Sequence, residues 1–186
     1  TIGLSNTSTG NSPLHSIASS SLDGYSLRNI GLRSGSAVIE ALTPLHNQNG
    51  DTALIAGLKA QKINLPLLVE LMGWPESLTT PSKSKDGEKF DYPLHVAIEK
   101  FYSDQNIPKN AIFSDRFKVV ISLIAMGSDP STKNSNGEKS WEISNPDPKT
   151  GREELISLVA SPEMWFENLQ SQDMVNIQET NCPNEI

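Results

Sequence analysis

One short stretch organises this chain: YPLHVAI, at residues 92–98. Similar strings open at residue 12 (SPLHSIA) and at residue 52 (TALIAGL), and a degraded copy opens at residue 139 (KSWEIS). The intervals between the starting residues are 40, 40 and 47 residues. Because chance rarely repeats one string at so regular a spacing, we interpret the chain as an array of four similar units.

Each string predicts the start of a short helix, because proline is tolerated in the first turn and a preceding Ser or Thr can cap it. A second apolar segment with i, i+3, i+4 spacing follows each string and predicts a second helix. These second segments span residues 36–42, 65–72, 116–126 and 152–160. Glycines at positions 10, 50 and 137 suit tight turns with positive φ, and Gly73 and Gly127 are placed to end helices in a left-handed conformation.

The predicted unit is therefore a turn, a short helix, a loop and a second helix. One such pair cannot bury its apolar face alone, whereas stacked neighbours bury it continuously. A linear core of this kind agrees with the composition, which is 36% hydrophobic and only 6% aromatic.

The strings resemble the ankyrin repeat, a unit of about 33 residues with a T-P-L-H-x-A signature. Pro13-Leu14-His15 and Pro93-Leu94-His95 match that signature directly. The stretch MGSDPSTKNSNG, at residues 126–137, is similar to the family's inter-repeat hairpin, with Asp129 and Asn134 at its turn-stabilising positions. The resemblance covers roughly residues 9–160. It implies an all-α, ankyrin-type solenoid of stacked helix-turn-helix repeats with short inter-repeat turns.

We expect an ankyrin repeat domain over residues 5–168, followed at 169–186 by a tail or capping segment. The repeats are placed at roughly 10–45, 50–85, 90–135 and 137–168. All spacings exceed the family's unit, which predicts loop insertions at 20–34 and 102–114. The literal match Thr43-Pro44-Leu45-His46 is not interpreted as the start of a repeat, because Asn49-Gly50 follows it where a helix should continue and Thr52 keeps the 40-residue spacing.

The three histidines do not indicate a metal or acid–base site, which would need at least two of them to converge. His15 and His95 occupy the same place in repeated units. The resemblance implies that each bonds to backbone near the turn and ties neighbouring repeats together. His46 is expected to be a surface residue.

Charge and composition exclude several classes of function. The formal net charge is -7, which does not fit a general binder of nucleic acid or anionic membrane. The longest apolar run, residues 119–126, is too short to span a bilayer. The single cysteine, Cys182, fits a reducing compartment, and no signal peptide is visible. We therefore expect a cytoplasmic monomer without membrane insertion.

No motif indicates catalysis, so we expect no enzyme, no cofactor and no metal. Asp51 and Asp91 each precede a predicted helix, where a negative charge is stabilising without any catalytic role. Asn136-Gly137-Glu138-Lys139-Ser140 lacks the spacing of a phosphate-binding loop.

The resemblance implies a scaffold or adaptor that binds another protein through the concave surface of the stack. The expected contacts lie on the turns, on the first helices and beside one turn. They are Asp51, Phe90, Asp91, Lys139, Ser16, Ser19, Lys59, Glu99, Lys100 and Trp74. Trp74 either packs under a loop or anchors a partner. The mixed-charge run at residues 82–89 is either a solvated loop or a fingertip that touches an acidic partner.

Two alternatives stay open. The chain could be the ankyrin module of a bacterial effector that acts on host proteins in the host cytosol. It could also be an enzyme with its site on the inserted loops, in which case Asp23 or Asp115 would be needed for activity.

Overall fold

The computed structural model describes residues 8–19, 36–84, 87–103 and 114–143, together with Val159 and Ser161. These residues are helical or lie in turns and form no strand. The helices are α1 (Pro13–Ala18), α3 (Ser36–Leu42), α4 (Ala53–Lys59), α5 (Leu65–Met72), α6 (Pro75–Thr79), α7 (Pro93–Ser103), α8 (Asp115–Ala125) and the 3-10 helix η2 (Ser140–Glu142). The predicted all-α class is confirmed for the described part of the chain.

Side-chain caps explain where several helices begin. The Thr52 hydroxyl accepts a hydrogen bond from the backbone N–H of Ile55, and the Asn64 side chain does the same for Leu67. Ser114 caps α8 through the N–H of Phe117. Each cap satisfies a backbone donor that has no partner inside its helix.

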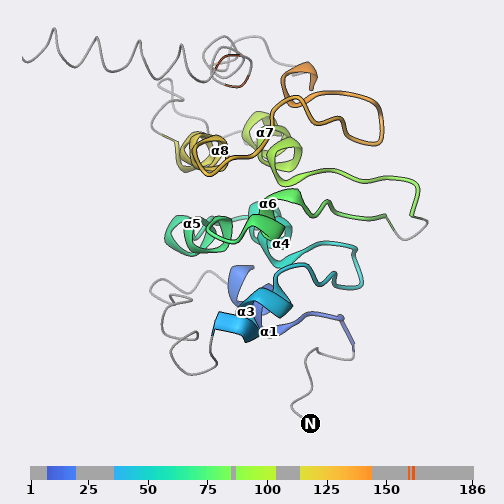
Figure 1. The fold of residues 1–186 in the computed structure, drawn as a ribbon, viewed down its shortest axis with the longest axis vertical. Coiled ribbons are helices and arrows are strands. Elements are labelled where there is room, and N and C mark those ends of the chain that lie inside the picture. The colour runs from blue at the N-terminus through green and yellow to red at the C-terminus, as the bar shows by residue number, and fades with distance from the viewer. Residues whose placement is uncertain are drawn as a thin grey trace, which may run out of the picture.

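The helices form two layers of successive pairs. In the first layer α1 contacts α4, α4 contacts α7, and α7 contacts η2. In the second layer α5 contacts α8, while α4 with α5 and α7 with α8 join the layers. Figure 1 shows α1 and α3 at one end of the molecule, α4 and α5 in the middle, and α7 and α8 beyond them. The core therefore runs along the stack between the two layers.

Equivalent core positions recur at the predicted interval. Leu14, Leu54 and Leu94 are 2%, 1% and 2% exposed. A Cβ atom at Gly57 would lie 2.6 Å from Leu68 Cδ2 and 3.1 Å from the carbonyl oxygen of Ala18. Glycine therefore lets α4 approach both α1 and α5 closely.

Four turns project from one side of the helix pairs (Figure 1). We call them fingers one to four: residues 8–11, 46–51, 81–84 with 87–91, and 133–138. Within a finger, the N–H of Asn47, Ser82 and Asn134 donates to the carbonyl of Asp51, Asp91 and Glu138, respectively, over 2.8–2.9 Å.

Backbone hydrogen bonds also join each finger to the next. Their N···O distances are 3.1 Å from Gln48 to Thr9, 2.7 Å from Lys83 to Gly50 and 3.1 Å from Ser135 to Phe90. The fingers thus form one continuous ridge, because each shares a main-chain bond with its neighbour.

Four of the five glycines expected in left-handed turns have that conformation: φ is 64° at Gly10, 77° at Gly50, 99° at Gly127 and 79° at Gly137. Gly73 differs, since its φ of -63° is right-handed. The chain re-enters a helix two residues later, at the start of α6, so no reversal is needed there.

Other departures concern lengths. Helix α6 lies inside the second repeat as placed at 50–85, at residues for which no helix was predicted, and α7 runs past the end of its string at residue 98 to Ser103. The fourth string forms only the single 3-10 turn η2. The insertion at 20–34, most of that at 102–114, nearly all of the helix expected at 152–160 and the tail at 169–186 lie outside the described residues.

Candidate binding surface

His15 and His95 each bond to the finger of the following repeat, as the resemblance implied. The Nε2 atom of His15 lies 2.8 Å from the carbonyl oxygen of Asp51, and Nε2 of His95 lies 3.0 Å from that of Glu138. A carbonyl can only accept, so Nε2 carries the proton in both rings. Both side chains are buried, and desolvation lowers the pKa of each below its ordinary value.

The two histidines differ at the other ring nitrogen. Nδ1 of His15 lies 2.7 Å from the Ser12 hydroxyl and 3.2 Å from the Ser12 amide nitrogen. Nδ1 of His95 is buried and has no hydrogen-bond partner. The cause is a substitution: Tyr92 stands where the first repeat has Ser12, and its hydroxyl is at the far end of a ring.

His46 is not the plain surface residue expected. It is half-buried, and its Nε2 atom lies 2.8 Å from the carbonyl oxygen of Pro81. The second repeat has Ile55 at the position of His15, so it lacks the signature histidine. His46, which lies before the repeated string, instead supplies the hydrogen bond from finger two to finger three. The prediction that residues 43–46 do not open a repeat is confirmed, because α3 ends at Leu42 and the next helix begins only at Ala53.

A polar groove of about 550 Å³ lies between the first two fingers and the first-layer helices α1 and α4. Its walls include Asn11, Ser19, Asn47, Asn49, Asp51 and Lys59. Amide and hydroxyl groups predominate, so the groove offers donors and acceptors to an extended polar ligand.

Asp51, expected as a turn residue that contacts a partner, is buried. It is 5% exposed, and its Oδ1 atom accepts from Nζ of Lys59 over 2.6 Å. The Lys59 side chain remains 41% exposed on the groove wall. The pair therefore presents a largely neutral surface in which lysine is the accessible member.

The other first-helix candidates are spread along the stack. Ser16 and Ser19 are exposed on and just after α1, Glu99 is exposed on α7, and Lys100 is half-buried there. Ser19, Lys59 and Glu99 stand at the same place in successive repeats, 40 residues apart. Trp74 is half-buried against the core at the start of α6.

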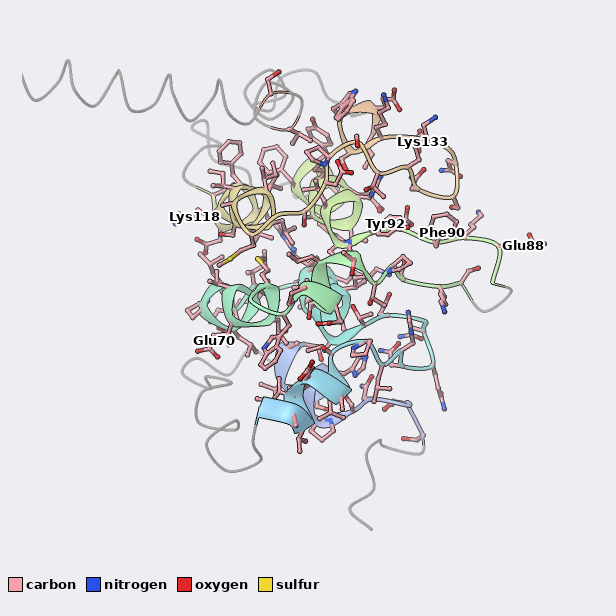
Figure 2. The ribbon with its side chains drawn as sticks, viewed as in Figure 1. Glu70, Glu88, Phe90, Tyr92, Lys118 and Lys133 are labelled. Carbon is pink, nitrogen blue, oxygen red and sulfur yellow. The ribbon has the colours of Figure 1, made fainter. Side chains whose placement is uncertain are left out.

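The remaining candidates gather on fingers three and four. The half-buried rings of Phe90 and Tyr92 meet edge to face with their centroids 6.0 Å apart. Asp91 Oδ1 accepts from the Asn134 side chain over 3.2 Å, and Nζ of Lys139 lies 4.9 Å from the centroid of the Trp141 ring. Figure 2 shows Phe90, Tyr92, Glu88 and Lys133 on the finger side, with Glu70 and Lys118 on the opposite side.

Asparagines at the bases of the fingers were only partly anticipated. The side-chain oxygen of Asn47 accepts from the N–H groups of Asn49 and Asp51, and its amide donates to Asn11 over 3.0 Å. Asn134 does the same within finger four and reaches back to Asp91. Both stand five residues before the helix-opening residue of their repeat, and this spacing is the signal that could have found Asn47.

Arg116 carries a structural link that the sequence did not suggest. From the first turn of α8, its guanidinium donates to the carbonyl oxygens of Leu58 and Ala60 at the end of α4. The two groups are more than 50 residues apart in sequence. Asp115, raised as a catalytic candidate, is exposed beside it and pairs with Lys118 at 3.0 Å; Asp23 lies outside the described residues.

Comparisons of the chain with protein-family models, with curated proteins and with solved structures give no match. None of the helices described has the length and apolarity needed to cross a bilayer. Within the same residues, no three His, Cys, Asp or Glu side chains are grouped so that they could hold a metal ion.

Proposed function

We propose that this chain is an ankyrin-type repeat module that binds another protein and catalyses no reaction. The ligand would lie along the surface formed by the fingers and the first-layer helices. The single observation that carries the proposal is the polar groove of about 550 Å³ between these elements.

The construction of that surface supports the proposal. Main-chain hydrogen bonds fix finger to finger, and His15 and His95 fix fingers to helices. A surface held in this way loses little conformational entropy when a ligand binds, so more of the contact energy appears as affinity. The groove walls are rich in amides, which suits an extended polypeptide with unpaired backbone groups.

Site-specific photo-crosslinking tests the proposal. A photoreactive amino acid is placed at Ser19 or Gln48 beside the groove and, as matched controls, at Glu70 or Lys118 on the opposite side (Figure 2). We expect one discrete adduct in cytosolic extract from the groove positions and none from the controls. The same adduct from both sides, or no adduct at Ser19 and Gln48, would contradict a binding groove.

A further inference from the structure

Fingers three and four depart from the rest of the ridge at three points, and the first two of these departures cost stability. The first is Tyr92, which replaces the hydroxyl-bearing residues Ser12 and Thr52 of the first two repeats. It cannot cap the helix as Thr52 does, and it leaves Nδ1 of the buried His95 without a partner.

The second departure is a pair of like charges. Lys133 and Lys139 stand opposite each other across an isolated antiparallel bridge in finger four. Lysines directly opposite on neighbouring strands repel, so this arrangement is unfavourable for folding.

The third departure is the length of finger three. Fingers two and four close from Asn47 to Asp51 and from Asn134 to Glu138, whereas finger three closes from Ser82 to Asp91. A further backbone bond from Ser84 to Lys89, at 2.8 Å, extends its hairpin beyond the last bonds to its neighbours. In Figure 2 its labelled residue Glu88 lies farthest out on the finger side.

Charges on this part of the ridge are unequally paired. The carboxylates of Asp91 and Glu138 accept hydrogen bonds from asparagine amides. The exposed amines of Lys83, Lys89 and Lys133 form none of the ion pairs found in the described residues. Asp91 and Glu138 keep their charge but are half-buried, so the exposed charges here are mainly positive, in a chain whose net charge is -7.

Local departures from good folding tend to coincide with functional surfaces. We propose that the basic–aromatic surface, made of Lys83, Lys89, Phe90, Tyr92, Lys133 and Lys139, binds an acidic segment of a partner protein that also carries an apolar side chain. The lysine amines pair with its carboxylates, and the edge-to-face rings of Phe90 and Tyr92 contact its apolar group. This inference rests on the proposed function and names the chemistry of the partner.

A short acidic segment fits better than an extended polyanion. Glu88, Asp91 and Glu138 lie among the lysines, and the whole chain repels a large anionic surface. The excess acidity of this chain belongs to one sequence segment: residues 153–186 contain seven Asp or Glu and no Lys or Arg, so residues 1–152, which include the whole basic–aromatic surface, are electrically balanced.

Fluorescence polarisation tests the inference with a labelled peptide of glutamates interrupted by single leucines. A matched peptide has glutamine in place of each glutamate. We expect the acidic peptide to bind the full chain, to bind more weakly as salt is added, and to lose about tenfold in affinity in a Lys89→Glu/Lys133→Glu variant. The charge-matched Lys62→Glu/Lys118→Glu variant should bind like the wild type.

Tyr92→Thr separates a binding role from a structural one. The new hydroxyl restores the cap and a partner for Nδ1 of His95, so the melting temperature should rise. Affinity for the acidic peptide should fall at the same time, because half of the aromatic pair is gone. A purely structural Tyr92 would instead lose stability on substitution and leave the affinity unchanged.

Several outcomes would overturn the inference. They are equal binding of the glutamine peptide, equal binding by the Lys89→Glu/Lys133→Glu variant, absence of binding, and comparable binding to phosphatidylserine vesicles. If the wild type self-associates and the Lys89→Glu/Lys133→Glu variant does not, the surface would instead bind residues 153–186 of a second copy of this chain. That result would contradict the proposal of a different partner. Adducts at Ser19 and Gln48 would keep the groove proposal valid in each of these cases.

Discussion

His15 and His95 are buried neutral in the folded protein, because desolvation lowers the pKa of both rings. The unfolded chain, with an ordinary histidine pKa of about 6.5, therefore binds more protons than the folded chain on the acid side of that value. Stability must fall as the pH drops through about 6.5 towards the lower folded pKa. The slope can reach about 1.4 kcal/mol per pH unit for each histidine.

Urea unfolding between about pH 7.5 and pH 5.5 measures this loss. In a His15→Gln/His95→Gln variant the amide side chains do not titrate, so the slope should flatten while the stability at neutral pH decreases. An unchanged slope in that variant would show that other groups cause the acid sensitivity.

Single residues also show how far the sequence could predict the site. The signature histidines and the positive-φ glycines were predictable, because each depends on contacts that recur with the repeat. The burial of Asp51 and the bond from His46 to Pro81 were not. Both depend on how one finger lies against another element, and a repeat pattern averages over that detail.

At the scale of the element, the fingers depend on close backbone approach. Gly50 and Gly137 have nearly equal φ values of 77° and 79°. A Cβ atom at residue 50 would fall 1.5 Å from the carbonyl oxygen of Lys83, whereas one at residue 137 would meet nothing within 4 Å. Substitutions at Gly50 and Gly137 therefore separate the strain of a left-handed conformation from the packing of finger two against finger three.

We expect Gly137→Ala to lower the free energy of unfolding by about 1 kcal/mol, the cost of left-handed alanine. Gly50→Ala should lose about 3 kcal/mol or more, because finger three must also move away. Equal melting temperatures of the two variants would mean that the contact between these fingers contributes little.

Elements were predictable where one face is apolar and a cap residue marks the start. The helices α3 and α5 begin and end where the apolar spacing placed them, and α8 is displaced by one residue. Helix α6 was missed because Pro75–Thr79 has only one buried apolar side chain, Leu78, and so gives no periodicity. The helix predicted for the fourth string is only a single 3-10 turn, since Lys139 and Trp141 replace the residues that cap and anchor a full helix.

At the scale of the molecule, most helix contacts join neighbouring pairs, and α5 with α8 and α4 with α7 hold the middle of the stack. Arg116 adds a polar link across the same junction, from α8 to the carbonyl groups that end α4. These carbonyls have no partner inside their own helix, so the guanidinium caps one pair from the next. Sequence periodicity predicts the layers but cannot show which long side chain spans them.

Arg116→Ala should therefore destabilise the whole stack and not one helix alone. We expect a loss of about 2 kcal/mol in the free energy of unfolding, the usual size for hydrogen bonds to a charged group. Arg116→Lys should recover only part of it, because an ammonium cannot present two donors in a fixed fork. Lys118→Ala is the control, because Lys118 lies two residues after Arg116 on the same helix and its side chain makes an exposed ion pair with Asp115. This substitution should change the free energy of unfolding by less than about 0.5 kcal/mol. Equal losses in Arg116→Ala and Lys118→Ala would show that the junction is held by apolar packing alone, with the guanidinium bonds contributing nothing measurable.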